Sequence, residues 1–109
     1  MYCYLLDANA NRSAKIPFEM EDTPLDILRR GCADRSNVFL KYLFSDENNF
    51  NAFLQGGDTL DTDASEFAYL GKTTTVKLRY EDPVGDRLQG VVNPQEDCVF
   101  QISVAMTVG

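Results

Sequence analysis

Apolar and polar residues alternate with a period of two in several short segments of the chain. In residues 73–80, the apolar Val76 and Leu78 alternate with the cationic Lys77 and Arg79. Successive side chains of a strand point to opposite faces of its sheet, so this pattern predicts a strand with one dry face and one wet face. The wet face displays polar and cationic side chains, which predicts an exposed sheet surface in this part of the protein.

Further strands are predicted at both ends of the chain. Residues 1–6 are apolar on both faces, which is typical of a central strand. Residues 14–20 alternate, and Pro17 has no backbone N–H to donate, so we expect an edge strand there. The polar turn at residues 7–13 joins the two segments into a hairpin. Residues 99–108 alternate most regularly of all and predict a final strand.

One helix is predicted immediately after the hairpin. Either Asp22 or Thr23 can cap this helix, and Pro24 suits the first helical position. Leu25, Leu28 and Cys32 then recur at helical spacing and form an apolar stripe that can face a sheet.

The middle of the chain gives a weaker pattern. Residues 38–44 form a short apolar run, and their β-branched and aromatic content favours a strand over a helical turn. Residues 45–48 resemble a helix start, and Gly56 and Gly57 would end that helix, although a hairpin through the two glycines is the alternative. Residues 58–71 are predicted to form a polar loop, whose last residues form a short apolar turn that attaches the loop to the protein.

Together these elements predict an α+β fold in which an antiparallel-rich mixed sheet packs against one or two helices. A chain of 109 residues forms one domain and can bury a core without disulfides or metal. Its net charge of −7, from 17 acidic and 10 basic residues, argues against direct binding to nucleic acid or to an anionic membrane. An acidic surface serves solubility, or it steers the protein to a basic partner.

The cysteines and the N-terminus predict an intracellular protein. No apolar run approaches the length of a membrane span, and the first residues lack the basic region of a secretory signal. Cys3, Cys32 and Cys98 are odd in number, form no metal motif and have no histidine beside them. We therefore expect buried thiols in a reducing, cytoplasmic compartment. A bridge between Cys3 and Cys98 on the terminal strands is the alternative.

The sequence offers no constellation for catalysis. Without histidine, neither a Ser-His-Asp nor a Cys-His arrangement can form. Asp61, Asp63 and Ser65 have the spacing of the first ligands of a calcium loop, but Glu66 and Lys72 stand where that loop needs glycine and glutamate. We expect no enzyme, no cofactor and no metal, and an exposed acidic loop is favoured there over a different kind of cation site.

The order of hairpin, helix, strand, loop and strand resembles the β-grasp, ubiquitin-like superfamily. Residues 18–28 are similar to its entry from strand to helix, and residues 38–44 to its third strand. Residues 57–60 resemble its glycine-to-leucine turn, and residues 70–80 its final strand. The resemblance covers about residues 1–80.

The resemblance implies a protein-binding module of the non-conjugated kind, such as a Ras-association or FERM-type module. Conjugated members end in Gly-Gly soon after the final strand, whereas this chain continues to Gly109 without that tail. On this assignment, residues 1–109 form a single domain. A β-grasp-like core spans residues 1–80, and residues 81–109 add a C-terminal β strand or hairpin.

Our leading hypothesis is a non-catalytic protein–protein interaction module that binds through an exposed sheet face. The residues assigned to that face are Thr75, Lys77, Arg79, Lys41 and Arg87.

Two alternatives come from other classes of protein. One is a small acidic inhibitor of phage or viral type that blocks a basic site on a nucleic-acid-binding protein. The other is a structural subunit that forms a homo-oligomer through open edges at strands 1–6 and 99–108. The acidic face assigned to the inhibitor consists of Asp58, Asp61, Asp63 and Glu66.

Overall fold

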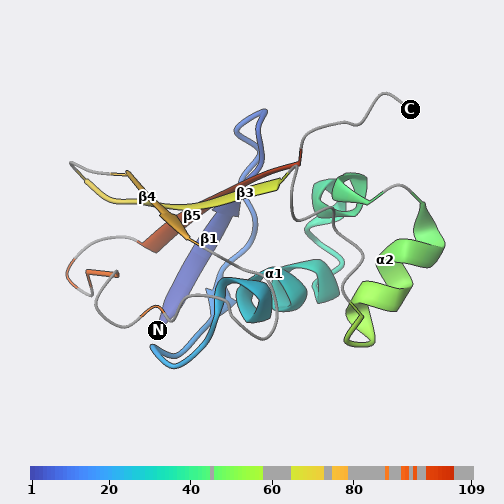
Figure 1. Ribbon diagram of the computed structural model, residues 1–109, viewed down its shortest axis with the longest axis horizontal. Helices are drawn as coiled ribbons and strands as arrows, with labels where there is room; N and C mark the ends of the chain where they lie inside the picture. The colour runs from blue at the N-terminus through green and yellow to red at the C-terminus, as the bar shows by residue number, and fades with distance from the viewer. Residues whose placement is uncertain are drawn as a thin grey trace.

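A mixed five-stranded sheet and a layer of helices make up the part of the protein that the computed structural model describes. The described residues are 1–44, 46–57, 65–72, 75–78, 88, 92–93, 95 and 98–104. The strands are β1 (Tyr2–Leu6), β2 (Ile16–Pro17), β3 (Ser65–Leu70), β4 (Thr75–Leu78) and β5 (Cys98–Val104). The helices are α1 (Pro24–Ala33), the 3-10 helix η1 (Val38–Leu43) and α2 (Glu47–Leu54). Figure 1 shows α1 and α2 on the same side of the sheet, and the predicted α+β class is confirmed.

The last strand of the sequence lies in the middle of the sheet, whose order is β2-β1-β5-β3-β4. Strand β5 runs parallel to β1, with Leu5 opposite Phe100, and antiparallel to β3, with Phe67 opposite Ile102. Two expectations change as a result. Strand β5, which lies within residues 81–109, is a central strand rather than one added to the sheet, and β1 and β5 each have a paired strand on both sides.

Helix α1 begins and packs as its sequence predicts. The Thr23 hydroxyl accepts a hydrogen bond from the Asp26 N–H at 3.4 Å, and the Asp26 carboxylate accepts one from the Thr23 N–H at 3.0 Å. This capping box satisfies two backbone N–H groups that the first turn would otherwise leave unpaired. The predicted stripe of Leu25, Leu28 and Cys32 is buried, as expected for an amphipathic helix, with Cys32 on the side of α1 that faces α2.

Close packing of α1 on the sheet depends on Gly31. A Cβ at this position would lie 2.9 Å from methyl groups of both Leu5 and Ile16. Contacts this short force neighbouring side chains to move, so a glycine here lets the helix approach β1 and β2 closely.

Residues 38–44 were predicted to form a strand, and this prediction is wrong because η1 occupies most of the segment. Leu40 and Phe44 are buried four residues apart, while Val38, Lys41 and Tyr42 point to solvent. That spacing follows a helical period and not a period of two. Burial of one helical face has outweighed the β propensity of the individual side chains, which depends strongly on context.

The end of the predicted polar loop is also a strand. Within residues 65–72, β3 buries Phe67 and Tyr69 and turns Glu66 and Ala68 to the other face. Residues 58–64 lie outside the described part of the chain. The short helix predicted after residue 45 is confirmed as α2, with the Asp46 carboxylate accepting a hydrogen bond from the Asn49 N–H.

Ser13 completes the hydrogen bonding of β1 with its side chain. Its buried hydroxyl accepts from the Leu5 N–H at 2.8 Å and donates to the Ala14 carbonyl at 2.8 Å. We expect Ser13→Ala to lower the free energy of unfolding by about 1–3 kcal/mol, because the Leu5 N–H would lose its partner inside the protein. Urea unfolding measures this loss.

The matched control for this prediction is Ser36→Ala. The Ser36 hydroxyl also donates a hydrogen bond, to Asp34, but it does so on the exposed surface. Its loss is expected to change the unfolding free energy by less than about 0.5 kcal/mol. Equal effects of the two substitutions would contradict a special role for Ser13.

Candidate functional site

The face of the sheet that points away from α1 and α2 is the leading candidate for a binding surface. Cys3 and Leu5 face the helices and are buried, so the alternate residues of β1 face the other way. None of the described helices covers this face. We call it the open face, and it consists of Tyr2, Tyr4, Leu6, Glu66, Ala68, Leu70, Thr75, Lys77, Val99, Gln101 and Ser103.

Lys77, a predicted binding residue, does lie on the open face, next to the predicted Thr75. Its ammonium group forms an ion pair with Glu66 at 3.2 Å, and both side chains are more than half exposed. Exposed pairs of this kind contribute little to stability. Glu66 had been assigned to a separate acidic face, so the structure brings one residue of each predicted surface together.

The other predicted residues divide into two groups. Lys41 lies on η1, on the helical side of the protein, because the segment around it is a 3-10 helix and not a strand of the sheet. It is therefore not part of the open face. The remaining assigned residues lie outside the described part of the chain; they are Arg79, Arg87, Asp58, Asp61 and Asp63.

A cluster of two tyrosines and two cations occupies the β1 side of the open face. The Arg12 guanidinium lies 3.8 Å from the centre of the Tyr4 ring, and the Lys15 ammonium lies 5.8 Å from the centre of the Tyr2 ring. Both arrangements are cation–π contacts. We call Tyr2, Tyr4, Arg12 and Lys15 the tyrosine–cation cluster, which no pattern in the sequence predicts.

The turn between β1 and β2 brings Arg12 to this position. The Asp7 carboxylate accepts hydrogen bonds from the N–H groups of Asn9 and Asn11 at 2.9 and 2.8 Å. Leu6 and Arg12 then pair across the two chain segments. Since cross-strand partners share a face of the sheet, the Arg12 side chain lies beside β1 on the open face.

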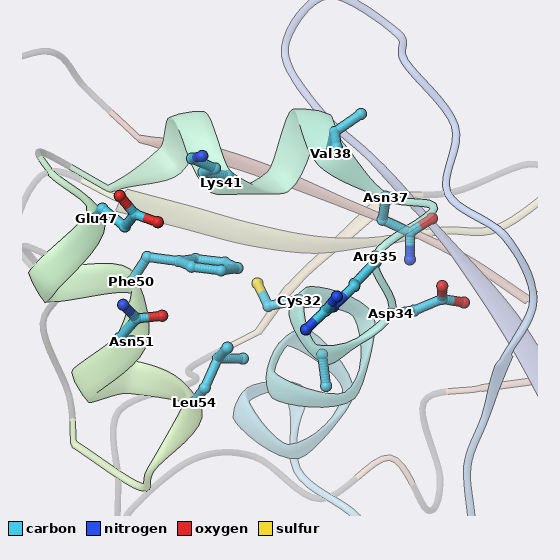
Figure 2. A pocket seen from close by; sticks show the side chains of 11 residues that line it. Cys32, Asp34, Arg35, Asn37, Val38, Lys41, Glu47, Phe50, Asn51 and Leu54 are labelled. Carbon is cyan, nitrogen blue, oxygen red and sulfur yellow. The ribbon is translucent and has the colours of Figure 1, made fainter.

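A pocket of about 490 Å³ lies on the helical side, between α1, η1 and α2. Figure 2 shows the Phe50 ring and the Cys32 sulfur pointing toward each other across it, with Leu54 below. Lys41 and Glu47 lie at its rim. Its volume is within the range of sites that bind small ligands, roughly 300–1,000 Å³.

Arg29 fixes one wall of this pocket. Its side chain donates hydrogen bonds to the carbonyls of Phe53 at 2.9 Å and Gly57 at 3.2 Å, and it lies 4.7 Å from the centre of the Phe53 ring. The carbonyls at the end of a helix have no partner within the helix, so this arginine caps α2 and attaches it to α1.

The thiols near these surfaces are poor nucleophiles. Burial raises the pKa of Cys32 to about 12, and burial together with the nearby Cys98 raises the pKa of Cys3 to about 12. Cys3 and Cys98 lie opposite each other in β1 and β5, yet none of the three cysteines forms a disulfide. At neutral pH the Cys3 and Cys32 thiols are protonated and act as small apolar groups.

Among the residues with described positions, no three or more acidic, cysteine or histidine side chains gather into a group able to hold a metal ion. Within the same residues, no helix has both the length and the apolar character needed to cross a membrane.

Comparisons with known proteins leave the chain without an assigned family. No family model matches it, and neither a curated protein nor a solved structure gives a match.

Proposed function

We propose that the protein is a non-catalytic interaction module that binds another protein through its open face. The supporting observation is an uncovered sheet face with a largely exposed aromatic residue: Tyr2 has 61% of its surface exposed. Beside it, Tyr4 and Val99 are partly exposed. Tyrosine and arginine are enriched at the centres of protein interfaces, and both occur on this face.

The ubiquitin-like resemblance remains part of the proposal. The order of hairpin, helix and further strands is compatible with a non-conjugated module of that superfamily. We also propose a reducing, cytoplasmic location. The absence of a disulfide among Cys3, Cys32 and Cys98 supports this location, since thiols persist in such compartments.

Affinity capture from an extract of the native host, with paired variants as bait, tests the proposed surface. The open-face variant combines Tyr2→Ser with Lys77→Glu, and the control is Lys41→Glu on the helical side. We expect the wild type and the control to retain the same partner. The open-face variant should capture at least about tenfold less of this partner, because the substitutions remove an aromatic contact and reverse a charge.

Thermal unfolding of each bait confirms that the substitutions leave the protein folded. Equal capture by the open-face variant and the wild type would refute the proposed surface. Loss of the partner with Lys41→Glu alone would instead place binding at the pocket between the helices.

The acidic-inhibitor alternative has less support. Glu66, the member of its assigned acidic face that is described, already pairs with Lys77. Capture that weakens steeply with salt and depends on the Asp61 side chain would favour that alternative.

A further inference from the structure

We propose that the tyrosine–cation cluster binds an acidic, extended segment of a partner polypeptide. This inference rests on the proposed function, because the cluster is part of the open face. It adds the chemistry of the partner and moves the centre of binding from Lys77 to β1.

The charges of Arg12 and Lys15 are not neutralised within the described structure. Elsewhere, Arg30 pairs with Asp22, and Lys77 pairs with Glu66. In contrast, Arg12 and Lys15 contact tyrosine rings and form no ion pair with a described residue. Two cations with no ion-pair partner in the described part of the chain can therefore contact an anionic partner.

Two described carboxylates near the cluster, Glu66 on the open face and Asp7 in the turn after β1, already have partners. The Asp7 carboxylate accepts three hydrogen bonds from Asn9 and Asn11, and Glu66 pairs with Lys77. Asp7 keeps its negative charge, but the cluster itself contributes two cations and no carboxylate, on a chain whose net charge is −7. An acidic segment is attracted to this position and repelled from most of the remaining surface, which favours one mode of docking.

The position of Arg12 suits recognition of a carboxylate. A guanidinium 3.8 Å from the Tyr4 ring is held by the aromatic surface, while its N–H groups have no partner among the described residues. A planar guanidinium can donate two parallel hydrogen bonds to one carboxylate. Because stacking already restricts the side chain, binding loses less conformational entropy.

The tyrosines supply the apolar part of the site. Tyr2 and Tyr4 are two residues apart on β1, so both rings lie on the same face, next to Val99 of β5. An apolar side chain within the acidic segment can pack there. Nucleic acid fits less well, because it requires a track of cations along its backbone.

Fluorescence anisotropy with a labelled synthetic peptide tests this inference directly. The probe is a short fluorescein-labelled peptide of glutamates with interspersed leucines. Comparison probes are the same peptide with lysine in place of glutamate, and a thymidine oligonucleotide of equal length. We expect saturable binding of the glutamate peptide that weakens as salt is raised, and weaker binding of both comparison probes.

Variants locate the binding and test its geometry. The double variant Arg12→Gln with Lys15→Gln is expected to bind the glutamate peptide about five- to tenfold more weakly, since two exposed charge contacts are lost. Arg12→Lys keeps the charge but loses the planar donor group, and it should bind with intermediate affinity. Lys41→Gln, on the helical side, should bind like the wild type.

The inference is overturned if the double variant binds the glutamate peptide as tightly as the wild type, or if either comparison probe binds more tightly. Its failure is distinguishable from failure of the proposed function. If the host partner is still lost with the open-face variant, the function stands and only the partner chemistry is wrong. If the peptide binds at the cluster but the open-face variant captures the host partner as well as the wild type does, the proposed function fails instead.

Discussion

Replacement of Phe100 by alanine is expected to lower the free energy of unfolding by about 3–5 kcal/mol. Phe100 has no exposed surface, and it lies on β5, the central strand of the sheet. The centre of its ring lies 5.6 Å from the ring centres of Phe67 and Tyr69. It lies 6.5 Å from the ring centre of Phe18, which it meets edge to face. Alanine would remove the shared partner of three aromatic side chains and leave a cavity that the paired strands cannot easily close.

Such a loss is a large share of the stability of an ordinary domain, about 5–15 kcal/mol. Urea unfolding followed by circular dichroism measures it. The neighbouring substitution Val99→Ala is the control, because Val99 points to the open face and is only partly buried. We expect that change to lower the stability by less than about 1.5 kcal/mol. Similar losses for the two variants would show that the ring cluster does not hold the sheet together.

Elements with strong local signals were predicted correctly. The cap at Thr23 and the stripe of Leu25, Leu28 and Cys32 are local features that identify α1 within one short segment. The alternation that buries Phe100 and Ile102 likewise identified β5. In each case a short segment carries both the start signal and the pattern of burial.

Placement of strands in the sheet could not be predicted in the same way. The position of β5 between β1 and β3 depends on pairing between residues far apart in the sequence, and no local pattern encodes strand order. Residues 38–44 show a second limit, because six of the seven positions are apolar or aromatic and fit either a helical period or a period of two. The packing of Leu40 and Phe44 against the helices decides in favour of η1.

The residues of the candidate site also divide into those that a local pattern places and those whose position depends on distant parts of the chain. Lys77 was correctly expected on an exposed sheet face, because the alternation within one strand was sufficient. The tyrosine–cation cluster was missed, because it joins Tyr2 and Tyr4 of one strand to Arg12 and Lys15 beyond the turn. Lys41 was assigned to the sheet face because its segment was predicted to be a strand, whereas that segment is the 3-10 helix η1.

The protein is expected to lose stability steeply in alkaline solution. Burial raises the pKa of both Cys3 and Cys32 from 9.0 to about 12. Between these values, the unfolded chain releases protons that the folded protein retains, so the unfolding free energy must fall as pH rises. The stabilisation is fully present below pH 9.0, and it is lost progressively as the pH rises toward about 12.

The expected size of this effect is large. Each unit of pH above 9 lowers the unfolding free energy by roughly 1.4 kcal/mol for each buried thiol. With two such thiols, the loss by about pH 11 is on the order of 5 kcal/mol, which is comparable to the whole stability of a small domain. Urea unfolding at a series of pH values from neutral to alkaline measures this slope.

The variant Cys32→Ala separates the thiol contribution from other effects of alkaline solution. Its stability at neutral pH is expected to be lower, because alanine leaves a small void beside Phe50 in the pocket wall. Its slope between pH 9 and about 11 should nevertheless be clearly shallower than that of the wild type, since one of the two raised pKa values is gone. An unchanged slope would mean that Cys32 ionises in the folded protein as readily as in the unfolded chain, and that its burial against α2 does not exclude water.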